Sequence, residues 1–297
     1  MAPWAFRRRM PEGDTIFRAA QMMHRALAGR AVIRFESVLP ALERVDHDRR
    51  IAGRTIDAVT SRGKHLLMTF SGDLILHTHM RMNGSWHLYR PNERWQRAAR
   101  DMRIVLATDT FVAVGFDVPV AEFITARDLL RHKALAELGP DLLDAGFDRL
   151  EAIRRMRSHG GEIIADVLLN QRVLSGIGNV FKSEVLFAAG IDPFGMVAAL
   201  PDTDLERIID LARKQLRANV LDRSRTLSPV SGRRTTGSLD PSAKLWVYGR
   251  GGKPCRRCGL TIQARKGGLD ARLTYWCPRC QPGSAASNSS GVSLQSG

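Results

Sequence analysis

The sequence predicts a multidomain α+β protein in which an N-terminal β-sandwich with flanking helices precedes a helical domain and a small four-cysteine domain. From residue 30 to about residue 122, short β-rich runs alternate with turn residues, a pattern typical of a sandwich or barrel. From Ala126 onward, apolar residues recur at helical spacing instead, which predicts helices. All four cysteines lie in two close pairs near the C-terminus.

The charge of the chain points to a polyanionic partner. The 297 residues include 45 Lys and Arg against 30 Asp and Glu, a net charge of +15. This excess favours nucleic acid as the partner, although a generally basic protein would have the same balance. No apolar run is long enough to span a bilayer, so a membrane partner is not expected. Close cysteine pairs suit metal binding in a reducing cytosol better than a disulfide framework.

A free proline amine is the candidate nucleophile. The chain reads Met10-Pro11-Glu12-Gly13 just before a predicted helix. If translation starts at Met10 and that residue is removed, Pro11 carries an N-terminal amine, whose pKa of about 8 lies well below the value of about 10 for lysine. The neutral amine can attack an aldehyde-like carbon and form an iminium, while Glu12 moves the protons. The alternative is that Pro11 only precedes a helix, where proline is common.

Residues 1–10 are expected to be a non-native or mis-assigned N-terminal extension. They carry three consecutive arginines but no apolar core, so they are not a secretory signal. The helix that follows is predicted to be capped by Asp14 and to end near Leu27, with its apolar residues on one face. Such a helix would hold Pro11 and Glu12 rigidly at its start.

Seven strands are expected in the N-terminal region, because each β-rich run is bounded by turn residues. They cover residues 31–38, 55–61, 65–70, 74–79, 85–89, 102–107 and 111–115.

Two features of these strands carry possible chemistry. Lys64 follows Gly63 between two strands, where a lysine can reach a phosphate that the backbone approaches closely; taken alone, it could equally be a solvated turn lysine. His77 and His79 share one face of a strand and resemble a pair of metal ligands. Without a third ligand in reach, we expect them to be ordinary strand-face histidines.

The helical region contains a glycine-rich turn. Helices are expected at residues 126–137, 147–157, 163–170, 179–189 and 203–220. Gly176-Ile177-Gly178 precedes the fourth of them, which begins at Asn179, and helix N-termini bind phosphate. The polar stretch 223–242 has no apolar period and is expected to be a mobile loop.

The four cysteines predict one structural zinc ion. Cys255 and Cys258 form one Cys-x₂-Cys pair, and Cys277 and Cys280 form the other, with eighteen residues between the pairs. This spacing is typical of a tetrahedral Cys₄ zinc site, whose ligands are all supplied by protein. A hairpin turning at Gly267-Gly268 between the pairs would carry arginines to its tip, and the tail after Gln281 is expected to be disordered.

The motifs together resemble one family. A Pro-Glu-Gly start, a Ser-Arg-Gly-Lys turn, Gly-Ile-Gly-Asn between two helices and a finger ending Tyr-Trp-Cys-Pro-Arg-Cys-Gln occur in this order between Pro11 and Gln281. This arrangement resembles the formamidopyrimidine-DNA glycosylase and endonuclease VIII family of base-excision repair enzymes, and most closely its actinobacterial endonuclease VIII branch. The resemblance implies that the paired helices form a helix–two-turn–helix domain.

The resemblance implies a role for each matching residue. Pro11 would attack C1′ of the damaged nucleotide, Glu12 would act as general acid and base, and Lys64 would bind the phosphate beside the lesion. Asn179 and Arg272 would grip the phosphates that flank the flipped nucleotide. Met82 matches the position that fills the gap in the base stack; an unbranched apolar side chain suits that role, although a core methionine is the alternative.

The implied reaction is that of a bifunctional DNA glycosylase and AP lyase. A Schiff base on Pro11 would be followed by β,δ-elimination, on double-stranded DNA containing oxidised bases or abasic sites. The 223–242 stretch lacks the pattern associated with capping oxidised guanine, which favours oxidised pyrimidines. Thr15 stands where the family often has a glutamate, which puts a second carboxylate role in doubt. We expect a monomer in the bacterial cytoplasm, associated with the nucleoid.

The expected domains are a catalytic β-sandwich at residues 11–135, a helix–two-turn–helix domain at 141–240 and a zinc finger at 241–282, with a disordered tail at 283–297. Two alternatives stay open: a nucleic-acid-binding protein without catalysis, and a glycosylase relative that binds lesions but has lost activity. The Pro-Glu start argues against the first because a binding protein has no need of a free proline amine. Glu12 and Lys64 argue against the second.

Overall fold

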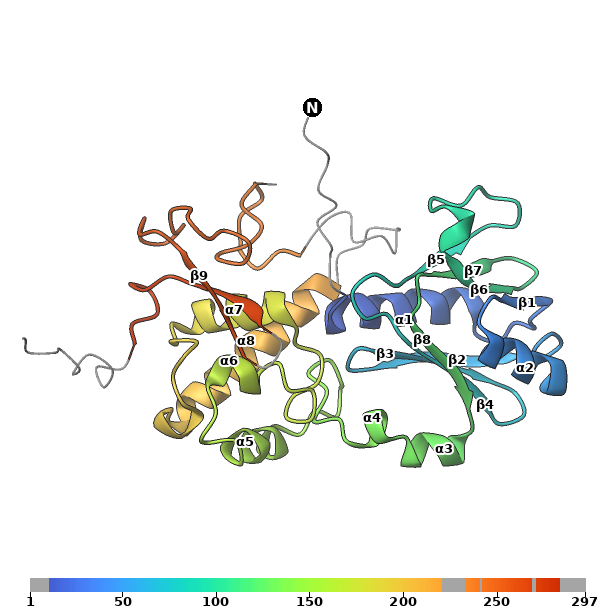
Figure 1. Cartoon of the computed structure of the whole chain (residues 1–297), viewed down its shortest axis with the longest axis horizontal. Coiled ribbons are helices and arrows are strands. Elements are labelled where there is room, and N and C mark those ends of the chain that lie inside the picture. The colour runs from blue at the N-terminus through green and yellow to red at the C-terminus, as the bar shows by residue number, and fades with distance from the viewer. Residues whose placement is uncertain (1–10, 221–232, 241, 269–270, 284–297) are drawn as a thin grey trace, which may run out of the picture. The chain divides into compact units, whose positions relative to one another are not determined.

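The computed structural model describes residues 11–220, 233–240, 242–268 and 271–283 (Figure 1). The expected extension at residues 1–10 lies outside this range, as do most of the expected mobile loop and nearly all of the expected tail. The chain forms two compact units: residues 1–147, 174–176 and 216–232 belong to unit 1, and residues 148–173, 177–215 and 233–297 belong to unit 2.

Unit 1 contains two four-stranded antiparallel sheets, as expected for a sandwich. One has the order β1-β6-β7-β5 and the other β2-β3-β4-β8. The strands of the first sheet are β1 (Arg34–Ser37), β5 (Ser85–Tyr89), β6 (Met102–Ala107) and β7 (Val112–Phe116). The strands of the second are β2 (Ile56–Arg62), β3 (His65–Phe70), β4 (Leu74–His79) and β8 (Val120–Ile124).

Helix α1 (Gly13–Leu27) shares one core with both sheets. Its inward residues Ile16, Met23 and Leu27 are at most 2% exposed and join a cluster that includes Leu66 of β3 and Trp86 of β5. In Figure 1 the helix runs between the label of β5 and those of β2 and β3. Because each such side chain leaves water completely, its burial stabilises the fold by about 2 kcal/mol before entropy is counted.

Several expected boundaries in unit 1 are wrong. The N-cap of α1 is Glu12, whose side chain makes no capping bond, so Asp14 is not the cap but a buried residue of the first turn. The helix expected at 126–137 is two short helices, α3 (Ala126–Arg131) and α4 (Lys133–Ala136), because the backbone at His132 is extended. Helix α2 (Pro40–Arg49) and strand β8 were not expected; a 3₁₀ turn, Ala99–Asp101, precedes β6.

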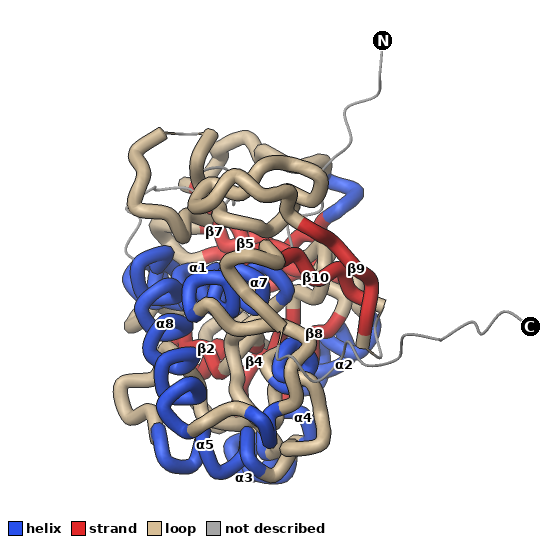
Figure 2. The backbone as a smooth tube through the Cα atoms, turned by 90° about the vertical axis from the view of Figure 1, so that its left-hand side faces the viewer, coloured by secondary structure: helices blue, strands red, loops and turns tan. Residues whose placement is uncertain are grey.

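Unit 2 is organised around α7 (Asn179–Ala189). Ten of its eleven residues are buried, and it contacts β10 (Arg272–Trp276) of the finger, which pairs with β9 (Gln263–Gly267). In Figure 2 the labels of α7, β9 and β10 lie together. The remaining elements are α5 (Arg149–Arg157), α6 (Ile164–Val167), a 3₁₀ turn (Val197–Ala199) and α8 (Asp202–Val220), whose last residues belong to unit 1.

The four helices predicted for this unit are present, and two of them, α5 and α6, are shorter than expected. Helix α7 has the expected range, whereas the helix expected at 163–170 is limited to the single turn α6. Within the described residues, no helix is both long and apolar enough to cross a membrane.

Candidate active site and nucleic-acid interface

The start of α1 is fixed by a contact between two glycine backbones. The Gly13 N–H donates to the Gly176 carbonyl at 2.8 Å, and a Cβ on Gly13 would lie only 2.7 Å from the Gly176 Cα. Glu12, the N-cap, is 1% exposed, and its carbonyl accepts the N–H groups of Thr15 and Ile16 at 3.0 and 3.1 Å. Pro11 is half-buried beside it. The Pro11-Glu12 pair is therefore carried by a rigid helix start, as the sequence predicts.

The turn that carries Lys64 packs against the residue next to Gly176. Gly63 has a φ of +57°, in the left-handed region that favours glycine. A Cβ there would lie 3.0 Å from the Cβ of Ser175. Lys64 follows as a half-buried residue at the entrance to β3.

Asp141 joins this turn to the same segment. Its Oδ2 accepts the Gly63 N–H at 2.7 Å, and its Oδ1 accepts the Leu143 N–H at 2.9 Å. The backbone N–H of Ser175 donates to the Pro140 carbonyl at 3.1 Å. Burial raises the pKa of the Asp141 carboxyl, while the two N–H donors oppose that rise.

The segment Leu174–Gly176 therefore contacts both the α1 start and the Lys64 turn. Within unit 1, this brings the predicted nucleophile, the predicted acid–base and the predicted phosphate ligand to one segment. Asp141 was not among the residues predicted from the sequence. Its signal was the Gly139-Pro140-Asp141 sequence, because an aspartate in a turn commonly accepts backbone N–H groups.

Met82 lies on the turn between β4 and β5. It is 39% exposed, so the alternative of a core methionine is wrong. The turn is closed by a bond from the Gly84 N–H to the Met80 carbonyl at 2.9 Å, and Arg81 has a φ of +45°. An exposed side chain on a tight turn is available to a ligand, and insertion into the base stack stays a prediction.

Asn179 and Arg272 lie close together in unit 2. Asn179 opens α7, and its Nδ2 donates to the carbonyl of Leu273, the residue after Arg272 in β10, at 3.0 Å. The buried Oδ1 of Asn179 has no hydrogen-bond partner among the described residues. Lys182 Nζ donates to Thr274 Oγ1 at 2.7 Å, which adds a second bond between α7 and β10. The finger hairpin is thus fastened to a helix N-terminus, which favours anions.

The four cysteines fit a zinc ion. Their sulfurs all lie within 4.8 Å of one another, with 3.9 Å between Cys255 and Cys280 and 3.4 Å between Cys258 and Cys277. A tetrahedral site with Zn–S bonds of about 2.3 Å needs sulfurs about 3.8 Å apart. A backbone donor at Leu260 lowers the pKa of Cys258 to about 7, whereas burial and the neighbouring sulfurs raise that of Cys280 to about 12. A bound dication lets all four ionise.

Three segments of the chain match described families. Residues 10–119 match the formamidopyrimidine-DNA glycosylase N-terminal domain, residues 138–229 match the H2TH domain of the same glycosylase, and residues 252–283 match the zinc finger found in FPG and IleRS.

Full-length relatives agree with these matches. The chain is 42% identical over 279 residues to a probable endonuclease 8 2 of Streptomyces coelicolor, covering 93% of this chain and 95% of the relative. It is 38% identical over 275 residues to the DNA-(apurinic or apyrimidinic site) lyase Nei2 of Mycolicibacterium smegmatis, covering 93% and 100%. A Lactococcus lactis Fpg in complex with abasic-site DNA has the same fold, with a TM-score of 0.76 at 24% identity and coverage of 92% and 100%.

A two-sheet domain, an H2TH domain and a Cys₄ finger in this order define a class of DNA-repair glycosylases. The chain belongs to the formamidopyrimidine-DNA glycosylase and endonuclease VIII family, and it is similar to the actinobacterial endonuclease 8 proteins of that family. It is an enzyme with the DNA glycosylase and AP-lyase activity of this family, and its finger holds one structural zinc ion.

Proposed function

We propose that this chain removes oxidised pyrimidines from double-stranded DNA through a Schiff base on Pro11, followed by β,δ-elimination. The observation that supports the proposal most strongly is the Leu174–Gly176 segment. It contacts both the helix start that carries Pro11 and Glu12 and the turn that carries Lys64. A nucleophile, a proton carrier and a cation are then held on one rigid frame, which is what a reaction at a charged sugar–phosphate requires.

The chemistry follows from the amine. The Pro11 nitrogen attacks C1′, the bond from C1′ to the base breaks, and the base leaves with a proton. The amine then loses its proton, the C1′–O4′ bond breaks with a proton going to O4′, and the opened sugar is held as an iminium. Glu12 would move protons at the sugar. The iminium acidifies the C2′ hydrogen; its loss expels the 3′ phosphate, and a second elimination expels the 5′ phosphate. The amine must be free, so we propose that the active chain begins at Pro11.

The DNA contacts follow from charge and exposure. Lys64, Asn179 and Arg272 would hold backbone phosphates, and Met82 would fill the gap left by the extruded base. The net charge of +15 supports a polyanionic partner. We further propose that the enzyme works as a monomer in the bacterial cytoplasm, where a reducing environment keeps the zinc-binding cysteines out of disulfides.

Two observations favour oxidised pyrimidines as the substrate class. The matched relatives carry endonuclease 8 names, and the stretch 223–242 lacks the sequence pattern that is associated with capping oxidised guanine. Both points favour pyrimidine lesions over 8-oxoguanine.

The proposal is tested by single-turnover incision of duplexes carrying 5-hydroxyuracil, 8-oxoguanine or an abasic site. The protein is the chain beginning at Pro11. We expect 5-hydroxyuracil to be cut at least about tenfold faster than 8-oxoguanine, a preference worth about 1.4 kcal/mol.

Glu12→Gln should slow base removal by about a hundredfold or more, since a positioned acid–base contributes that much. The control is Glu43→Gln, which changes an exposed glutamate of α2. Faster cutting of 8-oxoguanine would refute the substrate class, and full activity of Glu12→Gln would refute the role of that residue.

A further inference from the structure

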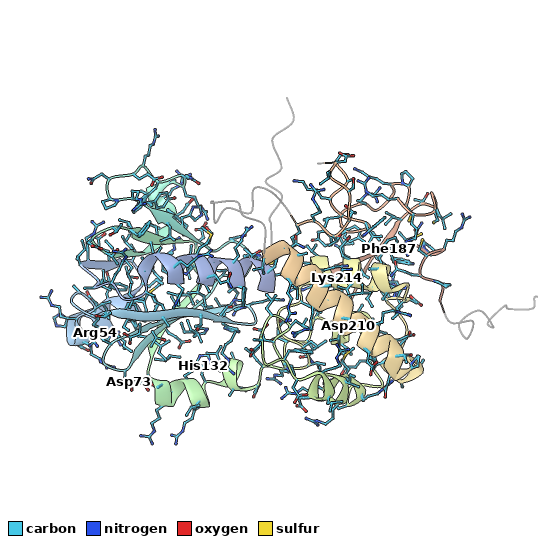
Figure 3. The ribbon with its side chains drawn as sticks, turned by 180° about the vertical axis from the view of Figure 1, so that it is seen from behind. Arg54, Asp73, His132, Phe187, Asp210 and Lys214 are labelled. Carbon is cyan, nitrogen blue, oxygen red and sulfur yellow. The ribbon has the colours of Figure 1, made fainter. Side chains whose placement is uncertain are left out.

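A cluster of histidines covers part of one face of the β2-β3-β4-β8 sheet. His77 and His79 alternate along β4, and His65 of β3 pairs in register with His79, so all three side chains leave the sheet on the same side. Glu122 of β8 pairs in register with His77. His132 reaches the cluster from the break between α3 and α4, where Figure 3 labels it.

Three of these side chains converge on one point. Glu122 Oε1 lies 2.9 Å from His77 Nδ1 and 2.9 Å from His132 Nε2, and the three ligand atoms all lie within 4.8 Å of one another. From the sequence alone, His77 and His79 are expected to be ordinary strand-face histidines because no third ligand is in reach. That premise is wrong: Glu122 and His132 come from elements 45 and 55 residues further along the chain.

The distances suit a transition metal. Zinc bonds of about 2.0–2.1 Å to nitrogen and oxygen in a tetrahedron put neighbouring ligand atoms about 3.4 Å apart. The two contacts of 2.9 Å to Glu122 Oε1 would therefore lengthen by about half an ångström. Two imidazoles and one carboxylate are a donor set for zinc and similar ions, whereas Mg²⁺ and Ca²⁺ prefer oxygen alone.

The second ring nitrogen of His77 also has a partner that suits metal binding. His77 Nε2 lies 2.8 Å from His65 Nδ1. When the His77 proton moves from Nδ1 to Nε2, it can donate to His65, which leaves Nδ1 free for a metal. A ligand histidine usually needs such a second partner.

We propose that His77, Glu122 and His132 bind a divalent transition-metal ion of the zinc type, with His65 as the residue that positions His77. The set supplies three protein ligands, which leaves a fourth position for water. The ion would fasten the connection between α3 and α4 to the sheet. It is separate from the Cys₄ ion of the finger, and the proposal is independent of the DNA chemistry.

The alternative is a hydrogen-bonded relay without a metal, in which one carboxylate oxygen of Glu122 accepts the N–H groups of His77 and His132. The buried His132 Nδ1 has no partner among the described residues in either arrangement, so this atom does not distinguish the two. The relay and the metal site predict different outcomes in a binding experiment.

The test uses the full chain with its finger already loaded with zinc. Isothermal titration with Zn²⁺ should reveal one further ion for each chain, and titration with Co²⁺ should give a spectrum without the thiolate charge-transfer band of a Cys₄ site. His132→Ala should abolish this binding, and Glu122→Gln should weaken it by at least about tenfold. His65→Ala should weaken it by about tenfold to a hundredfold, the range for a second-sphere partner.

The control is His159→Ala, which removes a histidine paired with Glu162 in unit 2 and should leave binding unchanged. Glu122→Gln keeps an oxygen that can accept both imidazole N–H groups, so this variant should stay folded even if His132→Ala does not. A wild-type melting temperature that rises with Zn²⁺, and a Glu122→Gln value that does not, would support the site. No further ion in the wild type, or equal affinity in Glu122→Gln, would overturn it.

Discussion

At the scale of single residues, the reactive end of the site depends on the absence of a side chain. The Gly13 and Gly176 backbones touch, with a hydrogen bond of 2.8 Å between them. Any Cβ at residue 13 would meet the Gly176 Cα at 2.7 Å, and the obstacle is backbone, which cannot rotate away. The position of Pro11 is thus set by two glycines 163 residues apart.

We predict that Gly13→Ala displaces the start of α1. The clash should lower kcat/KM by about a hundredfold, since a misplacement of about 1 Å can cost that much, and should destabilise the fold by about 1–3 kcal/mol. Single-turnover incision and urea unfolding would measure the two effects. Gly161→Ala is the matched control, because no atom lies within 4 Å of its added Cβ. Equal activity of the two variants would contradict this account of the site.

A buried histidine on β5 should make stability depend on pH. Burial and Arg97 lower the pKa of His87 to about 4, from 6.5 in a model peptide. Between these values the unfolded chain binds a proton that the folded chain does not, so the free energy of unfolding falls as pH falls from about 6.5 toward 4. Because the ring keeps some solvent access, we expect a loss of only about 1 kcal/mol between about pH 6.5 and pH 5.

His87→Gln should remove this part of the pH dependence. Urea unfolding at about pH 7 and about pH 5 gives the comparison with wild type, and His47→Gln on the exposed side of α2 is the control. If wild type and His87→Gln lose the same stability on acidification, His87 is not the group responsible.

The sequence identified residues whose chemistry is local and missed those whose role depends on the fold. Pro11, Glu12 and the cysteines stand in short motifs that can be read directly. Asp141 could not be assigned, because its partner Gly63 is 78 residues away and only the fold brings them together. Glu122 and His132 were missed for the same reason.

At the scale of elements, most strands were predictable and their exceptions have physical causes. The bounds expected for β3, β4, β5 and β6 agree with the structure, because turn residues bracket each of them. Helix α2 escaped notice because only Leu42 of its ten residues is buried, which leaves no apolar period; the proline at its start was the remaining signal. The half-buried edge strand β8 has no clear alternation either.

A single carboxylate connects α7 to the segment that leads into the finger. Glu184 is completely buried, and its oxygens accept the backbone N–H groups of Trp246, Val247 and Tyr248 at 2.7–2.9 Å and the hydroxyl of Thr235. Burial raises the pKa of Glu184, and these donors oppose the rise. These hydrogen bonds therefore offset the free-energy cost of removing the carboxylate from water, which a buried charge requires.

We predict that Glu184→Gln loosens the finger. A glutamine keeps one acceptor oxygen but turns an NH₂ group toward backbone donors, which should cost about 2–3 kcal/mol. Zinc release to a chelator should become faster, with Cys277→Ser as the variant that lacks the full ligand set. Glu206→Gln, which changes an exposed glutamate of α8, is the matched control. Unchanged zinc release in Glu184→Gln would show that the finger is held by other contacts.

At the scale of the whole molecule, charge should govern affinity for DNA. The chain has a net charge of +15, and each phosphate that a cation neutralises releases counterions. If about six phosphates are contacted, affinity for undamaged duplex should fall by about a thousandfold between about 50 mM and 200 mM salt. Fluorescence anisotropy across that range measures the slope. Arg272→Ala should reduce the slope of log affinity against log salt concentration by about 1, the value for one phosphate contact. An unchanged slope would show that Arg272 does not contact a phosphate.

The central claim is that the Pro11 amine forms a covalent intermediate with damaged DNA. The most direct measurement is borohydride trapping on a duplex carrying 5-hydroxyuracil, with the chain that begins at Pro11 compared with the chain that keeps residues 1–10. A covalent adduct with the first version alone, abolished when Pro11 is replaced by an N-acetylated proline, is the predicted result. Tight DNA binding without an adduct from either version would contradict the account and favour a binding protein without this catalysis.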